Sequence, residues 1–137
     1  MIDENFRVLI LDPSRTMCRL IETIVGQLYK KSSVTHADDA DDVVKRLKNK
    51  STYDFIFLDW DMASKANVLR AMYPYKGRSL IILTTIELTQ AKINISLKAG
   101  ANNCMQKPFD YDCFVRMITD TRKMSALLEA QKVLKTT

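Results

Sequence analysis

Four apolar runs in this chain each end in residues whose side chains can take part in chemistry. The ends, in chain order, are Asp12 after residues 8–11, Asp59 after 55–58, Thr84 and Thr85 after 80–83, and Gln106 and Lys107 after 104–105. A carboxylate can act as a covalent nucleophile toward phosphorus. A transferring phosphoryl group needs cations and hydrogen-bond donors around it. Two carboxylates, a hydroxyl and an ammonium therefore suit phosphoryl transfer if the fold brings them together.

The same runs predict the strands that would do so. Runs that are unbroken, apolar and rich in β-branched residues are typical of strands buried on both faces, as in parallel sheets covered by helices. In an open parallel α/β sheet, ligands bind outside the carboxyl ends of the strands. The four ends are therefore expected to meet at one edge of the sheet.

Helical patterns separate the strands, with a weaker strand predicted at residues 34–37. Apolar residues recur at helical spacing within 17–28, 40–47, 68–72, 89–99 and 111–134. Thr89 and Asp110 are predicted as N-caps, and Gly100 as a C-terminal stop. Strict alternation predicts an α/β fold: a doubly wound, five-stranded parallel sheet with helices on both faces.

Composition narrows the class of protein. The chain of 137 residues predicts one domain, and three cysteines without a CxxC pair argue against a disulfide framework. No apolar run approaches membrane-spanning length, and the amino terminus lacks the pattern of a signal peptide. The net charge of +5 is mild, and the basic pairs Lys30–Lys31 and Lys45–Arg46 are scattered along the chain. We therefore expect a cytoplasmic domain that binds neither membrane nor, directly, nucleic acid.

Three stretches resemble receiver domains of bacterial response regulators, especially the single-domain chemotaxis type. The first is residues 8–19 and the second is residues 57–62. The third is the C-terminal part of the resemblance, where residues 98–101 read Lys-Ala-Gly-Ala and residues 107–109 read Lys-Pro-Phe. The resemblance predicts a receiver domain over residues 1–124 and a C-terminal helical extension or connector over 125–137. For the five-stranded parallel sheet expected from the apolar pattern, the resemblance implies a flavodoxin-like topology with strand order 2-1-3-4-5.

The resemblance implies a role for each strand end. It implies that Asp59 is the phosphoacceptor, Lys107 the active-site lysine and Thr85, rather than Thr84, the switch hydroxyl. It also implies an Mg²⁺ cofactor, for which Asp12, Asp59 and Asp61 are the candidate ligands. The Lys107–Pro108 peptide bond is a candidate for the cis form.

The family also implies the partners. A histidine kinase or phosphotransfer protein would donate the phosphoryl group, and a downstream protein or output domain would receive the signal. A homodimer through the face of the fourth helix, fifth strand and fifth helix is possible in such domains. The chain would be regulatory, with self-phosphorylation and self-dephosphorylation as its only enzymatic activities.

Several positions depart from the family pattern. Pro13 replaces the second of two adjacent acids, so Mg²⁺ binding is expected to be weakened. Asp61 restores a carboxylate nearby, and Asn67 stands where a glycine is usual but tolerates a positive φ. Cys104 replaces the aromatic ring that normally reports phosphorylation.

These departures leave an alternative open. A degenerate receiver would use the same fold as a phosphorylation-independent protein-interaction module. A flavin-binding protein of the same topology is disfavoured, because residues 12–15 read Asp-Pro-Ser-Arg and contain no glycine for a phosphate loop. His36 is expected to be a core or edge residue rather than a phosphocarrier, and Cys18 and Cys113 to be packing residues.

Overall fold

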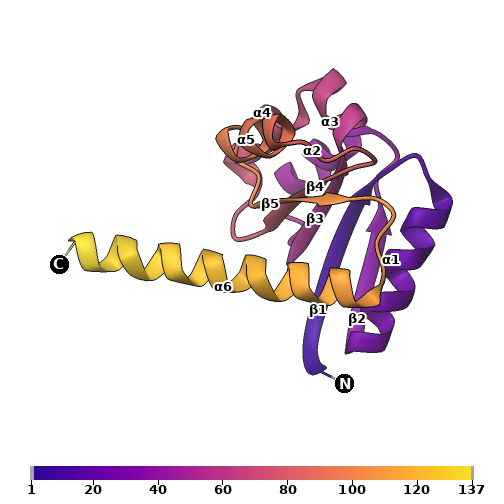
Figure 1. Ribbon diagram of the computed structural model, residues 1–137, viewed down its shortest axis with the longest axis horizontal. Coiled ribbons are helices and arrows are strands. Elements are labelled where there is room, and N and C mark those ends of the chain that lie inside the picture. Colours follow the sequence, from indigo (N-terminus) through magenta and orange to yellow (C-terminus); the bar gives the residue numbers. More distant parts are fainter. Residues whose placement is uncertain (1, 137) are drawn as a thin grey trace.

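The sheet has the predicted composition and order. The computed structural model describes residues 2–136, with side chains for residues 5–64 and 67–135. All strand pairs are parallel, in the order β2-β1-β3-β4-β5 (Figure 1). The strands are β1 (Ile2–Leu11), β2 (Tyr29–His36), β3 (Phe55–Asp59), β4 (Leu80–Thr85) and β5 (Asn103–Gln106). This arrangement confirms the doubly wound fold.

Helices cover both faces of the sheet. They are α1 (Arg15–Leu28), α2 (Ala40–Lys48), α3 (Trp60–Ala66), α4 (Val68–Met72), the 3-10 turn η1 (Tyr73–Tyr75), α5 (Gln90–Lys98) and α6 (Tyr111–Thr136). The core under α1 and α6 contains an aromatic series formed by Phe6, Phe55, Phe57 and Phe114. Aliphatic side chains such as Leu9, Ile56 and Leu83 form the core under α2 and α4. Every residue of β3 is buried, as the unbroken apolar run predicts.

The predicted helix ends are confirmed. The Thr89 hydroxyl accepts a hydrogen bond from the backbone N–H of Lys92 (3.2 Å), and the Asp110 carboxylate accepts one from Cys113 N–H (2.8 Å). Gly100 follows α5 with a φ of +106°, and a Cβ at this position would lie 2.7 Å from the Tyr73 ring. Glycine is therefore required there for both conformation and space.

The prediction for the third helical segment was incomplete. It placed one helix at 68–72, whereas α3 already begins at Trp60, directly after β3. Residues 60–66 show no clear apolar stripe, and their helix begins at the carboxylate of Asp59, which acts as N-cap. Asn67 has a φ of 52° and separates α3 from α4, so the expected left-handed turn is present.

Strand β2 is longer than predicted and forms one edge of the sheet. It starts at Tyr29 rather than at residue 34 and pairs with β1 from Ile2 to Ile10. His36 at its end is exposed, 3.4 Å from a carboxylate oxygen of Glu22, which fits the expected edge position. Cys18 is buried as expected, but Cys113 is exposed, so its role as a packing residue was wrong.

The carboxyl-terminal helix is a single continuous element. Its first half packs on the sheet through buried residues such as Phe114 and Ile118, and its second half projects beyond the body of the domain (Figure 1). The apolar side chains of this second half are exposed; they are Met124, Leu127, Leu128, Val133 and Leu134. No helix in the described part of the chain combines the length and the apolar character needed to cross a bilayer.

Candidate functional site

Lys107 joins the two predicted acids at the carboxyl edge of the sheet. Its Nζ donates hydrogen bonds to Asp12 Oδ2 and to Asp59 Oδ1, each at 2.8 Å. The side chains are 9% exposed for Lys107, 3% for Asp12 and 11% for Asp59. Burial alone would lower the pKa of Lys107, because it disfavours the charged form. The hydrogen bonds to the two carboxylates have the larger combined effect, so the pKa of Lys107 is raised. The ammonium therefore stays charged between two carboxylates.

The backbone fixes both carboxylates. Asp12 Oδ1 accepts a hydrogen bond from Ser14 N–H at 2.9 Å, and Asp59 Oδ2 accepts one from Met62 N–H at 3.1 Å. The first bond lies at the start of α1, and the second caps α3. Each acid therefore uses one oxygen for the backbone and the other for Lys107.

The two threonines at the end of β4 have different surroundings. Thr84 pairs with Asp59 in the sheet register, and its hydroxyl donates to the carbonyl of Leu58 at 3.4 Å. Because side chains alternate along a strand, the Thr85 side chain lies on the opposite face of β4 from that of Thr84. Its hydroxyl accepts a hydrogen bond from Lys92 Nζ at 2.8 Å. Its carbonyl accepts one from Lys107 N–H at 2.7 Å, which ties the end of β4 to the loop that carries Lys107.

Sequence reasoning missed Lys92. Its ammonium lies 5.5 Å from the centroid of the Trp60 ring, and Trp60 directly follows Asp59. The only sequence signal is that Lys92 falls three residues after the predicted cap Thr89. That spacing does not distinguish it from an ordinary surface lysine, because nothing in it reports the direction of the side chain.

The three candidate metal ligands are not brought together as a set. Asp12 and Asp59 converge on Lys107, whereas Asp61 is exposed in the first turn of α3. Among the described residues, no three Asp, Glu, His or Cys side chains gather closely enough to hold a metal ion. Mg²⁺ is often bound by one or two carboxylates, with waters and phosphate oxygens completing its shell. Asp12 and Asp59 meet that minimum, and no third carboxylate of the described residues adds to it.

Comparison with known proteins identifies the family of this chain. The family model for the response regulator receiver domain matches residues 8–119. The chain belongs to this family. Receiver domains act in two-component signalling and phosphorelay, and they are regulatory domains rather than conventional enzymes.

Chemotaxis proteins are among the similar sequences. The chain is 27% identical to the chemotaxis protein CheY-3 of Vibrio cholerae over 114 residues, which cover 80% of this chain and 85% of that protein. It is 29% identical to CheY1 of Helicobacter pylori over 108 residues, covering 75% of this chain and 86% of that protein. These receiver-domain relatives are matched over most of their length.

Solved structures agree on the fold. A response regulator from Thermotoga maritima superposes with a TM-score of 0.74 at 18% identity, covering 86% of this chain and 98% of that one. A response regulator from Clostridium difficile superposes with a TM-score of 0.73 at 16% identity, covering 87% of this chain and 97% of that one. At these identities the likeness supports the receiver fold and nothing finer.

Proposed function

We propose that Asp59 accepts a phosphoryl group from a phosphohistidine donor and that phosphorylation changes a protein-interaction surface. The observation that supports this proposal is the buried Lys107 ammonium, 2.8 Å from Asp12 and from Asp59. Three charges held in this geometry at a sheet edge suit phosphoryl chemistry better than they suit stability, since buried ion pairs gain little over apolar packing.

The reaction balances with the residues at the site. A carboxylate oxygen of Asp59 attacks phosphorus, an acyl phosphate forms, and the P–N bond breaks with its electron pair staying on the donor imidazole. Lys107 already contacts Asp59 Oδ1, so its ammonium is in place to receive a phosphoryl oxygen. The Thr85 hydroxyl can donate a hydrogen bond to a phosphoryl oxygen if it gives up its long hydrogen bond of 3.4 Å to the carbonyl of Glu87.

Mg²⁺ fits this mechanism as a weakly held cofactor. Receiver domains generally bind Mg²⁺ at an acidic site, where it neutralises charge on the transferring group. Asp12 and Asp59 are the residues that would hold it. Pro13 offers no side-chain ligand, and Asp61 is exposed, so any contribution from Asp61 would be indirect. We therefore propose weaker Mg²⁺ binding than a site with two adjacent acids would give.

The partners follow from the family. We propose a histidine kinase or phosphotransfer protein as donor and a downstream protein or output domain as receiver of the signal. The face formed by α5, β5 and α6 is the proposed contact surface, for a partner or for a homodimer. Residues 125–137, of which residue 137 lies outside the described part of the chain, serve in this proposal as a helical extension or connector. The cytoplasm is the proposed compartment.

A degenerate receiver is the second candidate. The feature that favours it is the combination of Pro13 with a site where, among the described residues, two carboxylates converge rather than three. Intact mass after incubation with acetyl phosphate and Mg²⁺ separates the two candidates. A gain of one phosphoryl group is expected, and an unchanged mass under conditions that phosphorylate an ordinary receiver would favour the phosphate-independent module.

A further inference from the structure

Lys92 in the first turn of α5 contacts two parts of the candidate site. Its Nζ donates a hydrogen bond to Thr85 Oγ1 at 2.8 Å and lies 5.5 Å from the centroid of the Trp60 ring. Trp60 is the neighbour of Asp59 in the chain, and Thr85 is the predicted switch hydroxyl. One half-buried side chain of α5 therefore contacts both the switch and the residue next to the acceptor.

The hydrogen bond from Lys92 does not use the proton of the Thr85 hydroxyl, which can therefore donate a hydrogen bond to a phosphoryl group. A hydroxyl has one proton to donate and two lone pairs that accept. Thr85 now donates to the carbonyl of Glu87 at 3.4 Å while it accepts from Lys92. It can redirect its proton to a phosphoryl oxygen and keep Lys92 on a lone pair. An ammonium in that position also polarises the hydroxyl and strengthens it as a donor.

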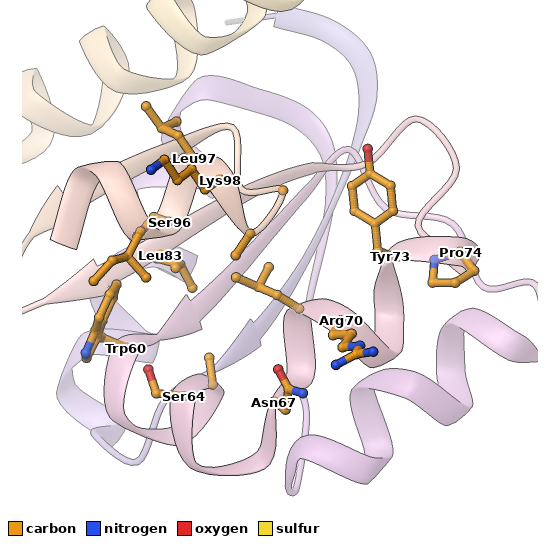
Figure 2. A pocket seen from close by; sticks show the side chains of 15 residues that line it. Trp60, Ser64, Asn67, Arg70, Tyr73, Pro74, Leu83, Ser96, Leu97 and Lys98 are labelled. Carbon is orange, nitrogen blue, oxygen red and sulfur yellow. The ribbon is translucent and has the colours of Figure 1, made fainter. Parts of the chain in front are cut away.

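The helix that carries Lys92 is loosely packed. Among the described residues of α5, Ser96 alone is buried, and Ile95 and Leu97 are exposed. A pocket of about 810 Å³ lies between α3–α4 and α5. Trp60 and Ser96 are among the side chains that line it (Figure 2). A helix with few buried contacts can shift at a small cost in free energy.

The backbone of Lys92 is linked in turn to β5. Ser96 Oγ donates a hydrogen bond to the Lys92 carbonyl at 2.6 Å, and the Cys104 thiol donates to Ser96 Oγ at 2.9 Å. Cys104 occupies the position where the family places its reporting aromatic ring. A movement at Lys92 can therefore reach β5 through hydrogen bonds, without that ring.

We propose that Lys92 is the positioning residue that couples Thr85 to α5. When Thr85 turns toward the phosphoryl group, the Lys92 ammonium follows the hydroxyl, leaves its position over Trp60 and displaces the first turn of α5. Lys92 acts through Thr85 and does not itself react. This inference rests on the proposed phosphorylation of Asp59.

The test compares two lysines of the same helix in the full chain. Lys92→Met removes the ammonium and keeps an unbranched apolar stem. Lys98→Met is the matched control, because it removes the same charge from an exposed position in the last turn of α5. Each variant is examined by intact mass after acetyl phosphate and Mg²⁺, and by backbone amide shifts with and without beryllofluoride.

In the wild type and in Lys98→Met we expect shift changes at Asp12 and Asp59 and along residues 90–98. Lys92→Met should gain the same phosphoryl mass and keep the changes at Asp12 and Asp59, but lose those along α5. Lys92→Arg keeps a cationic donor on a long stem and should retain the α5 response.

Two results would overturn the proposal. One is an α5 response in Lys92→Met equal to that of the wild type. The other is loss of the response in both Lys92→Met and Lys92→Arg, which would indicate a purely structural role. A wild type that gains no phosphoryl mass and shows no shifts around Asp59 would instead defeat the proposed phosphorylation, and this inference with it.

Discussion

The backbone N–H of Met62 donates a hydrogen bond to Asp59 Oδ2 at 3.1 Å, so the proposed phosphoacceptor is also the N-cap of α3. The other oxygen, Oδ1, faces Lys107 at 2.8 Å. The two oxygens therefore have different partners, and one can react while the other continues to cap the helix. This link between the acceptor and α3 makes the choice of substitution at Asp59 important.

Asp59→Asn is expected to abolish the gain of phosphoryl mass and to leave the fold intact. The carboxamide oxygen can still accept the Met62 N–H, and asparagine is as good an N-cap as aspartate. Asp59→Ala removes nucleophile and cap together and should cost about 1 kcal/mol more in the free energy of unfolding. Intact mass and urea denaturation measure the two effects. Phosphorylation of Asp59→Asn on one site would show that another residue is the acceptor.

Pro13→Asp is expected to tighten Mg²⁺ binding, because it restores a second carboxylate beside Asp12. A gain of about tenfold in affinity would correspond to ~1.4 kcal/mol. Trp60 fluorescence provides the titration signal, since the indole follows Asp59 directly. Pro13→Ala is the control that removes the ring without adding a ligand. If Pro13→Asp and the parent bind Mg²⁺ equally, water or Asp61 already supplies the missing interaction.

The residues whose positions the sequence predicted correctly are those at the ends of buried strands. An apolar run fixes where a strand lies, and parallel topology brings the carboxyl ends to one edge, so Asp12, Asp59 and Lys107 could be grouped from the sequence. Helix α3 was not predicted from the sequence, because its start depends on the Asp59 cap rather than on an apolar stripe. Lys92 could not be predicted because a long, flexible side chain can point in many directions, and its direction is set by contacts with Thr85 and Trp60 that only the structure shows.

Thr85→Ala and Lys92→Met are expected to have non-additive effects on the α5 response. Each removes one end of the same 2.8 Å hydrogen bond, so the double variant should respond to beryllofluoride no less than either single variant. Residues that act through one interaction couple in this way, whereas independent residues add. Amide shifts along residues 90–98 provide the measurement. Additive losses would mean that Thr85 and Lys92 reach α5 by separate routes.

Gly100→Ala should destabilise the domain, because the methyl group would lie 2.7 Å from the Tyr73 ring and the φ of +106° disfavours any side chain. We expect a loss of about 1–3 kcal/mol. Gly26→Ala is the matched control, since Gly26 lies within α1 and its new Cβ would meet no heavy atom within 4 Å apart from its chain neighbours and the backbone of its own helix. That change should stabilise the domain by about 0.5–1 kcal/mol. Urea denaturation of both variants tests the contrast in sign.

The last prediction concerns the pH dependence of stability above neutral pH. The carboxylates of Asp12 and Asp59 raise the pKa of Lys107 above its ordinary value of 10.5. The folded state therefore binds this proton more tightly than the unfolded state, so the stabilisation is complete below pH 10.5 and is lost as pH rises through the folded pKa. Lys107→Met leaves two carboxylates without their cation and should lose about 3 kcal/mol at pH 7. The difference from the wild type should shrink above pH 10.5.

Lys76 provides the comparison of opposite sign. Burial, with a smaller contribution from the charge of Lys132, lowers the pKa of Lys76. Its protonated form is therefore disfavoured by folding, and the resulting loss of stability disappears as pH rises through the lowered pKa. Lys76→Met should be neutral or stabilising at pH 7, and any gain should vanish toward pH 10.5. Urea denaturation of the wild type and both variants between neutral pH and about pH 11 separates an ammonium paired with two carboxylates from a half-buried one that donates a hydrogen bond to the Ser79 carbonyl. If the Lys107→Met difference stayed constant across that range, Lys107 would not be paired with the two acids in solution.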